Sequence, residues 1–134
     1  MTLGRKVFPR GERPTRRAVK ERVTHWRQRL GLDGWAFGLR FETDADGTIA
    51  GCIAEPEYRQ ATLYFDLRQM HRDDLDHMVV HEMLHAVAWP LANVAQTLAG
   101  KDRAKLEWVR TMEEGLVTDL ERIVLRLSVG AADR

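Results

Sequence analysis

Residues 78–89 of the chain read MVVHEMLHAVAW, and this segment constrains the fold more than any other. It is apolar on nearly all sides apart from His81, Glu82 and His85, so we expect it to form a buried helix. Burying two imidazoles and a carboxylate without partners would cost on the order of several kcal/mol. A bound metal ion would remove that penalty, so the segment predicts a metal site within the helix packing.

The spacing of the three polar residues predicts their roles. His81 and His85 are separated by about 6 Å of rise and 40° of rotation, so both imidazoles project from one face and can share a Zn²⁺ ion. Glu82 lies about 100° round the helix, where it can reach a water on the metal and pass its proton to a leaving amine. This is the HExxH pattern of metallopeptidases, with Glu82 as general base and acid. His77 lies about 12 Å along the axis from His85, too far to share an ion with it, so we expect it to be exposed or to make an outer hydrogen bond.

A catalytic zinc site needs a third protein ligand and one open position. No histidine follows His85, and the longer HExxHxxGxxH pattern fails because Ala88 and Leu91 stand where its glycine and last histidine would be. A downstream carboxylate is therefore required. The adjacent Glu113 and Glu114 are the candidates.

Periodicity and turn residues predict an α+β fold. The expected elements are a helix over 15–30 with Thr15 as its cap, strands over 35–42, 48–54 and 60–67 with a turn over 43–47, the motif helix from Asp73 or Asp74 to Trp89, and a last helix over about 103–128. We expect Pro90 to end the motif helix and residues 91–102 to form a short helix and a loop. Gly115 inside the last helix costs about 1 kcal/mol against alanine, which indicates close packing or a function there. The expected organisation is a basic flexible arm over 1–14 and a single domain over 15–134.

The charge is unevenly distributed. Residues 1–30 contain ten Lys/Arg and two acids, whereas residues 31–134 contain eleven Lys/Arg and eighteen acids. A solvated tail is one interpretation, and weak contact of the arm with nucleic acid or with the acidic body is another. No apolar run reaches the roughly 18 residues that cross a bilayer, and the first residues lack a Sec-type signal. With Cys52 as the only cysteine, an ordinary thiol, we expect a cytoplasmic protein without a membrane partner.

The order His81-Glu82-x-x-His85 and then a helical glutamate resembles the gluzincin metallopeptidases. The thermolysin family carries Asn-Glu-x-x-Ser-Asp on that second helix, and EEGLVT at 113–118 is similar to this pattern. The resemblance implies that Glu114 is the third ligand and that Thr118, in place of the aspartate, holds the first histidine. Glu113 is expected to lie beside the ligands, and it is also the alternative third ligand. The order of elements also resembles the zincin-like core of the minigluzincins, small zinc peptidases that phages and prophages often encode.

The resemblance also implies where a peptide or protein substrate would bind. In that fold the strand before the motif helix borders the cleft, so the backbone of Ala61–Asp66 would pair with an extended substrate. Tyr64 or Tyr58 would stabilise the oxyanion, although each can equally be an ordinary strand tyrosine. Two other readings remain: a non-catalytic regulatory or nucleic-acid-associated module that contains zinc, and a zymogen whose basic tail plugs the cleft.

Overall fold

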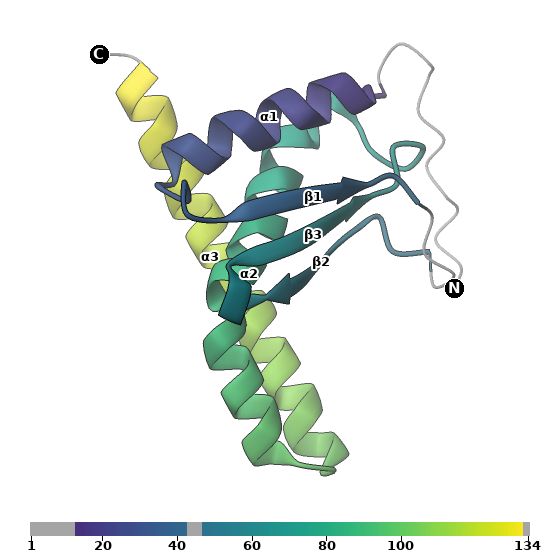
Figure 1. The fold of residues 1–134 in the computed structure, drawn as a ribbon, viewed down its shortest axis with the longest axis vertical. Coiled ribbons are helices and arrows are strands. Elements are labelled where there is room, and N and C mark those ends of the chain that lie inside the picture. The colour runs from purple at the N-terminus through teal and green to yellow at the C-terminus, as the bar shows by residue number, and fades with distance from the viewer. Residues whose placement is uncertain (1–12, 43–46, 133–134) are drawn as a thin grey trace.

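The computed structural model describes residues 13–42 and 47–132 and has the expected α+β architecture. The elements are α1 (Arg16–Arg29), β1 (Ala36–Arg40), β2 (Ala50–Glu55), the 3₁₀ turn η2 (Pro56–Tyr58), β3 (Gln60–Phe65), the 3₁₀ turn η3 (Arg72–Asp74), α2 (Leu75–Ala99) and α3 (Arg103–Ala132) (Figure 1). Thr15 caps α1 as predicted, because its hydroxyl accepts from the backbone N–H of Ala18. The arm predicted over 1–14 and the turn predicted over 43–47 lie largely outside the described residues.

The sheet has the order β1-β3-β2, with β3 parallel to β1 and antiparallel to β2. Because both edges of β3 are paired, Ala61–Asp66 has no free backbone edge, and the prediction that this strand pairs with substrate is wrong. Leu63 and Phe65 point into the core, so Tyr64 points to the opposite face, away from α2. The prediction that Tyr64 stabilises an oxyanion is therefore also wrong.

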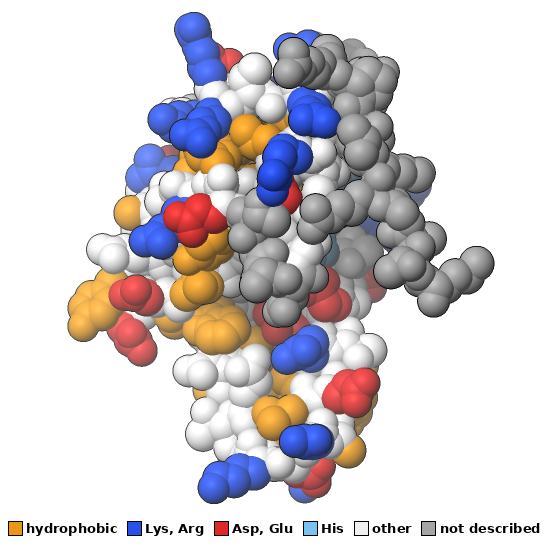
Figure 2. Space-filling view, turned by 90° about the vertical axis from the view of Figure 1, so that its right-hand side faces the viewer, with side chains coloured by type: hydrophobic (Ala, Val, Ile, Leu, Met, Phe, Trp, Pro, Cys, Tyr) orange, Lys and Arg blue, Asp and Glu red, His pale blue; other side chains and the backbone are white. Residues whose placement is uncertain are grey.

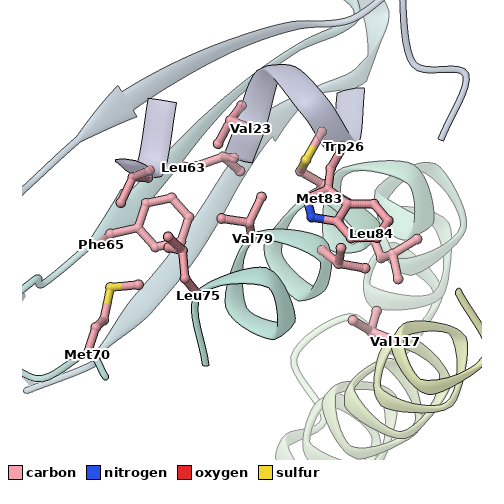
Figure 3. Close-up of a cluster of buried hydrophobic side chains, with 12 residues drawn as sticks. Val23, Trp26, Leu63, Phe65, Met70, Leu75, Val79, Met83, Leu84 and Val117 are labelled. Atoms are coloured by element: carbon pink, nitrogen blue, oxygen red, sulfur yellow. The ribbon is translucent and has the colours of Figure 1, made fainter. Parts of the chain in front are cut away.

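The inner face of the sheet packs against α1 and α2 (Figure 3). Apolar residues from α1, β3 and the first half of α2 form the main core, among them Val23, Trp26, Leu63, Phe65, Val79 and Met83. Asp76 in the first turn of α2 ties the two helices together, because it accepts from Arg22 Nε at 2.6 Å and from Trp26 Nε1 at 2.8 Å. These contacts fix the position of α2 against the sheet.

Helix α2 continues through Pro90 to Ala99, so the prediction that it ends at Pro90 is wrong. A proline inside a helix removes one backbone hydrogen bond and crowds the preceding turn. Here packing against α3 holds the second half of α2 in place, with Ala88, Ala92 and Ala95 lining the contact. Gly100, at φ 62°, ends the helix, and α3 returns antiparallel to it. The second half of α2 and the first half of α3 form a hairpin that projects beyond the sheet (Figure 1).

The types of side chain on the surface differ along the length of the molecule. In Figure 2, Lys and Arg side chains are frequent at the top of the view, where α1 lies, and hydrophobic side chains are visible on the narrower hairpin below. Within the described residues, none of the helices contains a stretch long and apolar enough to cross a bilayer.

Candidate metal centre

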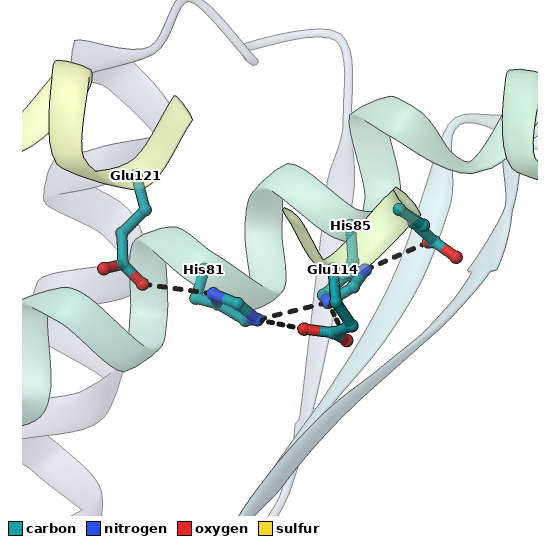
Figure 4. A network of polar contacts seen from close by, with 5 residues as sticks. His81, His85, Glu114 and Glu121 are labelled. Carbon is teal, nitrogen blue, oxygen red and sulfur yellow. Dashed lines mark hydrogen bonds and ion pairs between the residues drawn. The ribbon is translucent and has the colours of Figure 1, made fainter. Parts of the chain in front are cut away.

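Three predicted ligands converge where α2 crosses α3 (Figure 4). The Nε2 atoms of His81 and His85 lie 3.2 Å apart. Glu114 reaches both from α3, with one carboxylate oxygen 3.2 Å from His81 Nε2 and the other 2.9 Å from His85 Nε2. The structure therefore brings together the two imidazoles and the carboxylate that the motif and the resemblance singled out.

The spacing of these atoms allows them to share one metal ion. Ligand atoms that each lie about 2.0–2.1 Å from a tetrahedral Zn²⁺ are about 3.3 Å from one another, and the two Nε2 atoms are 3.2 Å apart. The two distances from Glu114 involve different oxygens of its carboxylate. One ligand atom from each of the three residues lies within 4.8 Å of the others, so the group could hold a metal ion.

The other ring nitrogen of each histidine faces a second glutamate. His81 Nδ1 lies 3.1 Å from Glu121 Oε1, and His85 Nδ1 lies 3.0 Å from Glu113 Oε1. A carboxylate also lies against each Nε2 atom, because Glu114 reaches both. With a cation at the Nε2 atoms in its place, each Nδ1–H would donate to its outer carboxylate, and this would fix the tautomer that ligates through Nε2. Glu121 and Glu113 are therefore placed to orient both histidines as ligands.

These contacts correct one expectation from the sequence and decide another. Glu121 occupies the place beside His81 that was assigned to Thr118, so that assignment is wrong. Glu113, which was expected outside the ligands with ligation as the alternative, lies beside the outer nitrogen of His85 and does not join the convergent group. Glu121 also lies 3.2 Å from Nδ1 of His77, whose side chain is 57% exposed. The prediction of an exposed His77 with an outer hydrogen bond is confirmed.

Sequence reasoning missed Glu121, although a signal for it exists. His77, His81 and His85 form a row along α2, and Glu114 and Glu121 are two turns apart on one face of α3. Because the helices are antiparallel, a row of carboxylates on α3 meets the row of imidazoles on α2. Comparing the rows on the two helices, not one family motif, would have found the pairing.

Glu82 lies beside the convergent group but is not part of it. It is 7% exposed. Burial raises the pKa of its carboxyl to about 7, and the negative charges of Glu114 and Glu121 add to this while His81 opposes it. A cation held by the histidines would lower this pKa again. Glu82 is thus a carboxyl whose protonation responds strongly to its immediate neighbours.

A cleft of about 350 Å³ opens next to Glu82, between the first half of α2 and the start of β2. His81 and Glu121 line it on one side, and Ile49 and Ala50 line it on the other. Among the residues that the structure describes, β2 is an edge strand, since it pairs only with β3. The Asp66 N–H donates to Ile49 O, and the alternation of an antiparallel ladder then directs the backbone groups of Ala50, Cys52 and Ala54 away from β3. An unpaired backbone edge therefore borders the cleft.

Two further side chains lie near this edge. Burial raises the pKa of the Cys52 thiol to about 12, with Glu82 and Glu113 adding to the effect, so the thiol stays protonated at neutral pH. This agrees with the prediction of an ordinary cysteine. Tyr58 lies in η2 just after β2 and is largely exposed, and its predicted role at an oxyanion stays a prediction.

Comparisons of the chain with protein-family models, with curated proteins and with solved structures found no match.

Proposed function

We propose that the chain is a zinc-dependent peptidase with a zincin-like active site. The observation that carries the proposal is the convergence of His81, His85 and Glu114, whose ligand atoms lie within 4.8 Å of one another, one residue away from a buried glutamate. Two imidazoles and one carboxylate are a ligand set typical of catalytic zinc. When bound, zinc would polarise the substrate carbonyl and make a water acidic enough to attack it.

The chain's own residues supply the remaining chemistry. Glu82 accepts the proton of the attacking water and delivers it to the departing amine, a role that its place beside the cleft supports. Glu113 and Glu121 keep the ring nitrogens of His85 and His81 in the ligating tautomer. Each of these three carboxylates has a separate task, and none competes with Glu114.

The edge of β2 is the surface that would hold an extended peptide. Its outward backbone groups at Ala50, Cys52 and Ala54 are available for pairing, and they border the cleft that contains Glu82. Pairing at an edge strand orients a peptide by its main chain, so the substrate class is an unfolded or flexible segment of a peptide or protein.

The cleft is also what favours an enzyme over the alternative module with a structural zinc. A structural zinc is enclosed by four protein ligands, whereas the described part of the chain presents three at this site, which lies against an open cleft. The predicted contact of the basic arm with nucleic acid stays a prediction, because the arm lies largely outside the described residues. Three arginines of α1 make contacts within the chain. Arg22 is bonded to Asp76, Arg27 to the carbonyls of Trp35 and Asp33, and Arg17 to Glu21.

The proposal is tested by Glu82→Gln, with zinc content and cleavage of an unfolded protein substrate measured together. We expect zinc content to be unchanged and cleavage to fall by about 10²–10⁴-fold, because general base catalysis is lost. Glu107→Gln, an exposed change on α3, is the matched control and should cleave like the wild type.

Metal analysis of Glu114→Ala and Glu113→Ala separates ligand from orienting residue. Loss of zinc in Glu114→Ala with retention of weaker binding in Glu113→Ala is the expected result. Cleavage at full rate by Glu82→Gln, or stoichiometric zinc in Glu114→Ala, would overturn the proposal.

A further inference from the structure

The projecting hairpin carries a row of exposed apolar side chains on α2. Val87, Leu91, Val94 and Leu98 are spaced by four, three and four residues, so they follow one another along a single face of the helix. Leu91 is 71% exposed and Leu98 is 81% exposed. The protein thus displays a helix face of the kind that normally packs against another helix.

Helix α3 continues this face. Trp108, Met112 and Leu116 are spaced by four residues and are all exposed. Together with Leu91 they line a groove of about 220 Å³ between the two helices, whose walls are almost wholly apolar. The groove joins the two rows into one surface, which we call the hairpin face and define as Val87, Leu91, Val94, Leu98, Trp108, Met112 and Leu116.

The hairpin face points away from the metal centre. At 100° per residue, Met112 is about 200° from Glu114 round α3, and Leu91 is about 240° from His85 round α2. A partner on this face would therefore leave the cleft beside Glu82 open.

The size and chemistry of the hairpin face suit a protein interface. Its seven side chains, each roughly half exposed or more, present on the order of 100 Å² apiece, which approaches the roughly 800 Å² per partner of a stable complex. Monomers rarely expose so large an apolar patch. The second half of α2, residues 86–99, contains no charged residue at all, so its partner must itself be apolar there.

The charges that border the hairpin face indicate which partner fits. Lys105 and Asp119 lie seven residues before and seven residues after Met112, and both are exposed. Seven residues are about 10.5 Å of helix and nearly two full turns, so both charges lie on the same side of α3 as Met112. If two copies of α3 pack antiparallel about a two-fold axis at Met112, Lys105 of each copy meets Asp119 of the other, and Trp108 meets Leu116. The face is therefore complementary to itself in both charge and shape.

Gly115 is consistent with this arrangement. It lies on the exposed side of α3, and a Cβ built there would meet nothing within 4 Å, so packing inside the chain does not require a glycine. A missing side chain on an exposed helix face lets a second helix approach closely.

We propose that the hairpin face binds a second copy of this chain, with the two α3 helices antiparallel about a two-fold axis at Met112. The resulting dimer buries both hairpin faces in a four-helix arrangement and holds two clefts that open away from the interface. The proposal does not depend on the proposed function, because none of its residues is a ligand or lines the cleft beside Glu82.

Sedimentation equilibrium of the full chain tests the dimer over about 1–200 µM, a range that brackets micromolar dissociation constants. The wild type should approach twice the chain mass of 15.4 kDa. Lys105→Asp and Asp119→Lys each place like charges opposite one another in both halves of the interface. Each should raise the dissociation constant at least about tenfold.

The double variant Lys105→Asp/Asp119→Lys restores opposite charges and should return the dissociation constant to within about threefold of the wild type. Glu107→Lys, a charge reversal about 140° round α3 from Met112, is the matched control and should leave it unchanged. Circular dichroism checks that every variant is folded. A wild type that stays monomeric throughout, or single variants that dimerise as tightly as the wild type, would overturn the proposal. So would a double variant that is no tighter than the singles.

Discussion

The two halves of α2 are similarly apolar in sequence but lie in opposite surroundings. In the first half, Val79, Val80 and Met83 are fully buried, because the sheet, α1 and α3 surround that part of the helix. In the second half, Leu91 and Leu98 are mostly exposed, and α3 packs against the other side of that part of the helix. The difference teaches that the apolarity of a segment measures how much surface it can bury, not whether its own chain covers it.

The largest expected effect is the difference in unfolding free energy between truncating a methionine in the core and truncating one on the hairpin. Met83 is 0% exposed and Met112 is 59% exposed. Met83→Ala should lower the free energy of unfolding by about 2–5 kcal/mol, because it leaves a cavity in the core. Met112→Ala should change it by no more than about 0.5 kcal/mol when urea unfolding is measured on dilute, monomeric protein. Equal losses would mean that the hairpin is as well packed as the core.

Zinc should raise the free energy of unfolding of the protein. Its proposed ligands on α2 lie between the two halves of that helix. Ligand that binds only the native state adds about 2.7 kcal/mol to the free energy of unfolding at a hundred times its dissociation constant. We expect such a gain for the wild type in thermal unfolding with and without Zn²⁺, and its loss in His85→Ala, which removes a ligand. His25→Ala, an exposed histidine on α1, is the control. A zinc response that survives in His85→Ala would contradict the ligand set.

Glu121→Gln should weaken zinc binding by about 10–100-fold, because the carboxylate that fixes the His81 tautomer becomes a neutral amide. Competition with a chromophoric chelator measures the affinity. Thr118→Val on the same helix is the comparison, and we expect its affinity to stay within about twofold of the wild type. The reverse ranking would restore Thr118 to the role that the sequence had suggested.

The smallest effect concerns acid stability in the core half. Asp66 at the end of β3 is buried, which by itself raises the pKa of its carboxyl, but hydrogen bonds from Gln69 and Arg68 outweigh burial and hold that pKa below 3.8. A lowered native pKa contributes stability that is complete above the unfolded value and is lost as the pH falls through the native value. Asp66→Asn should therefore flatten the loss of unfolding free energy below about pH 4. If the unfolding free energy of Asp66→Asn falls with pH as steeply as that of the wild type, Asp66 does not contribute to the loss of stability in acid.

Local patterns predicted the elements of the core half well. The alternation in 35–42 and 60–67 and the Thr15 cap signal are properties of neighbouring residues, and the structure confirms the strands and the helix that they predicted. Strand order is not local, so the sequence did not reveal that β3 is central and that β2 provides the free edge. The error at Pro90 has the same origin, since contacts with α3 override a local helix-breaking signal.

The candidate site shows the same difference between what local sequence predicts and what depends on packing between elements. The spacing within HEMLH requires one helix only, and the structure places His81 and His85 on one face as predicted. The partner of each imidazole depends on how α3 is rotated and shifted against α2, which no single motif specifies. For this reason Glu114 was identified through a resemblance, while Thr118 was assigned the place that Glu121 occupies and Glu121 was missed.

The three convergent residues come from consecutive helices joined only by residues 100–102. Closing such a short connection has a small entropic cost, and contacts between adjacent helices form quickly. The parallel pair of β1 and β3, by contrast, must bring Ala36 beside Gln60 across an intervening strand. We therefore expect the helical pair to assemble early during folding and the sheet to dock onto it later. The half of the molecule that contains the proposed metal centre would then serve as the template on which the proposed substrate-binding edge is built.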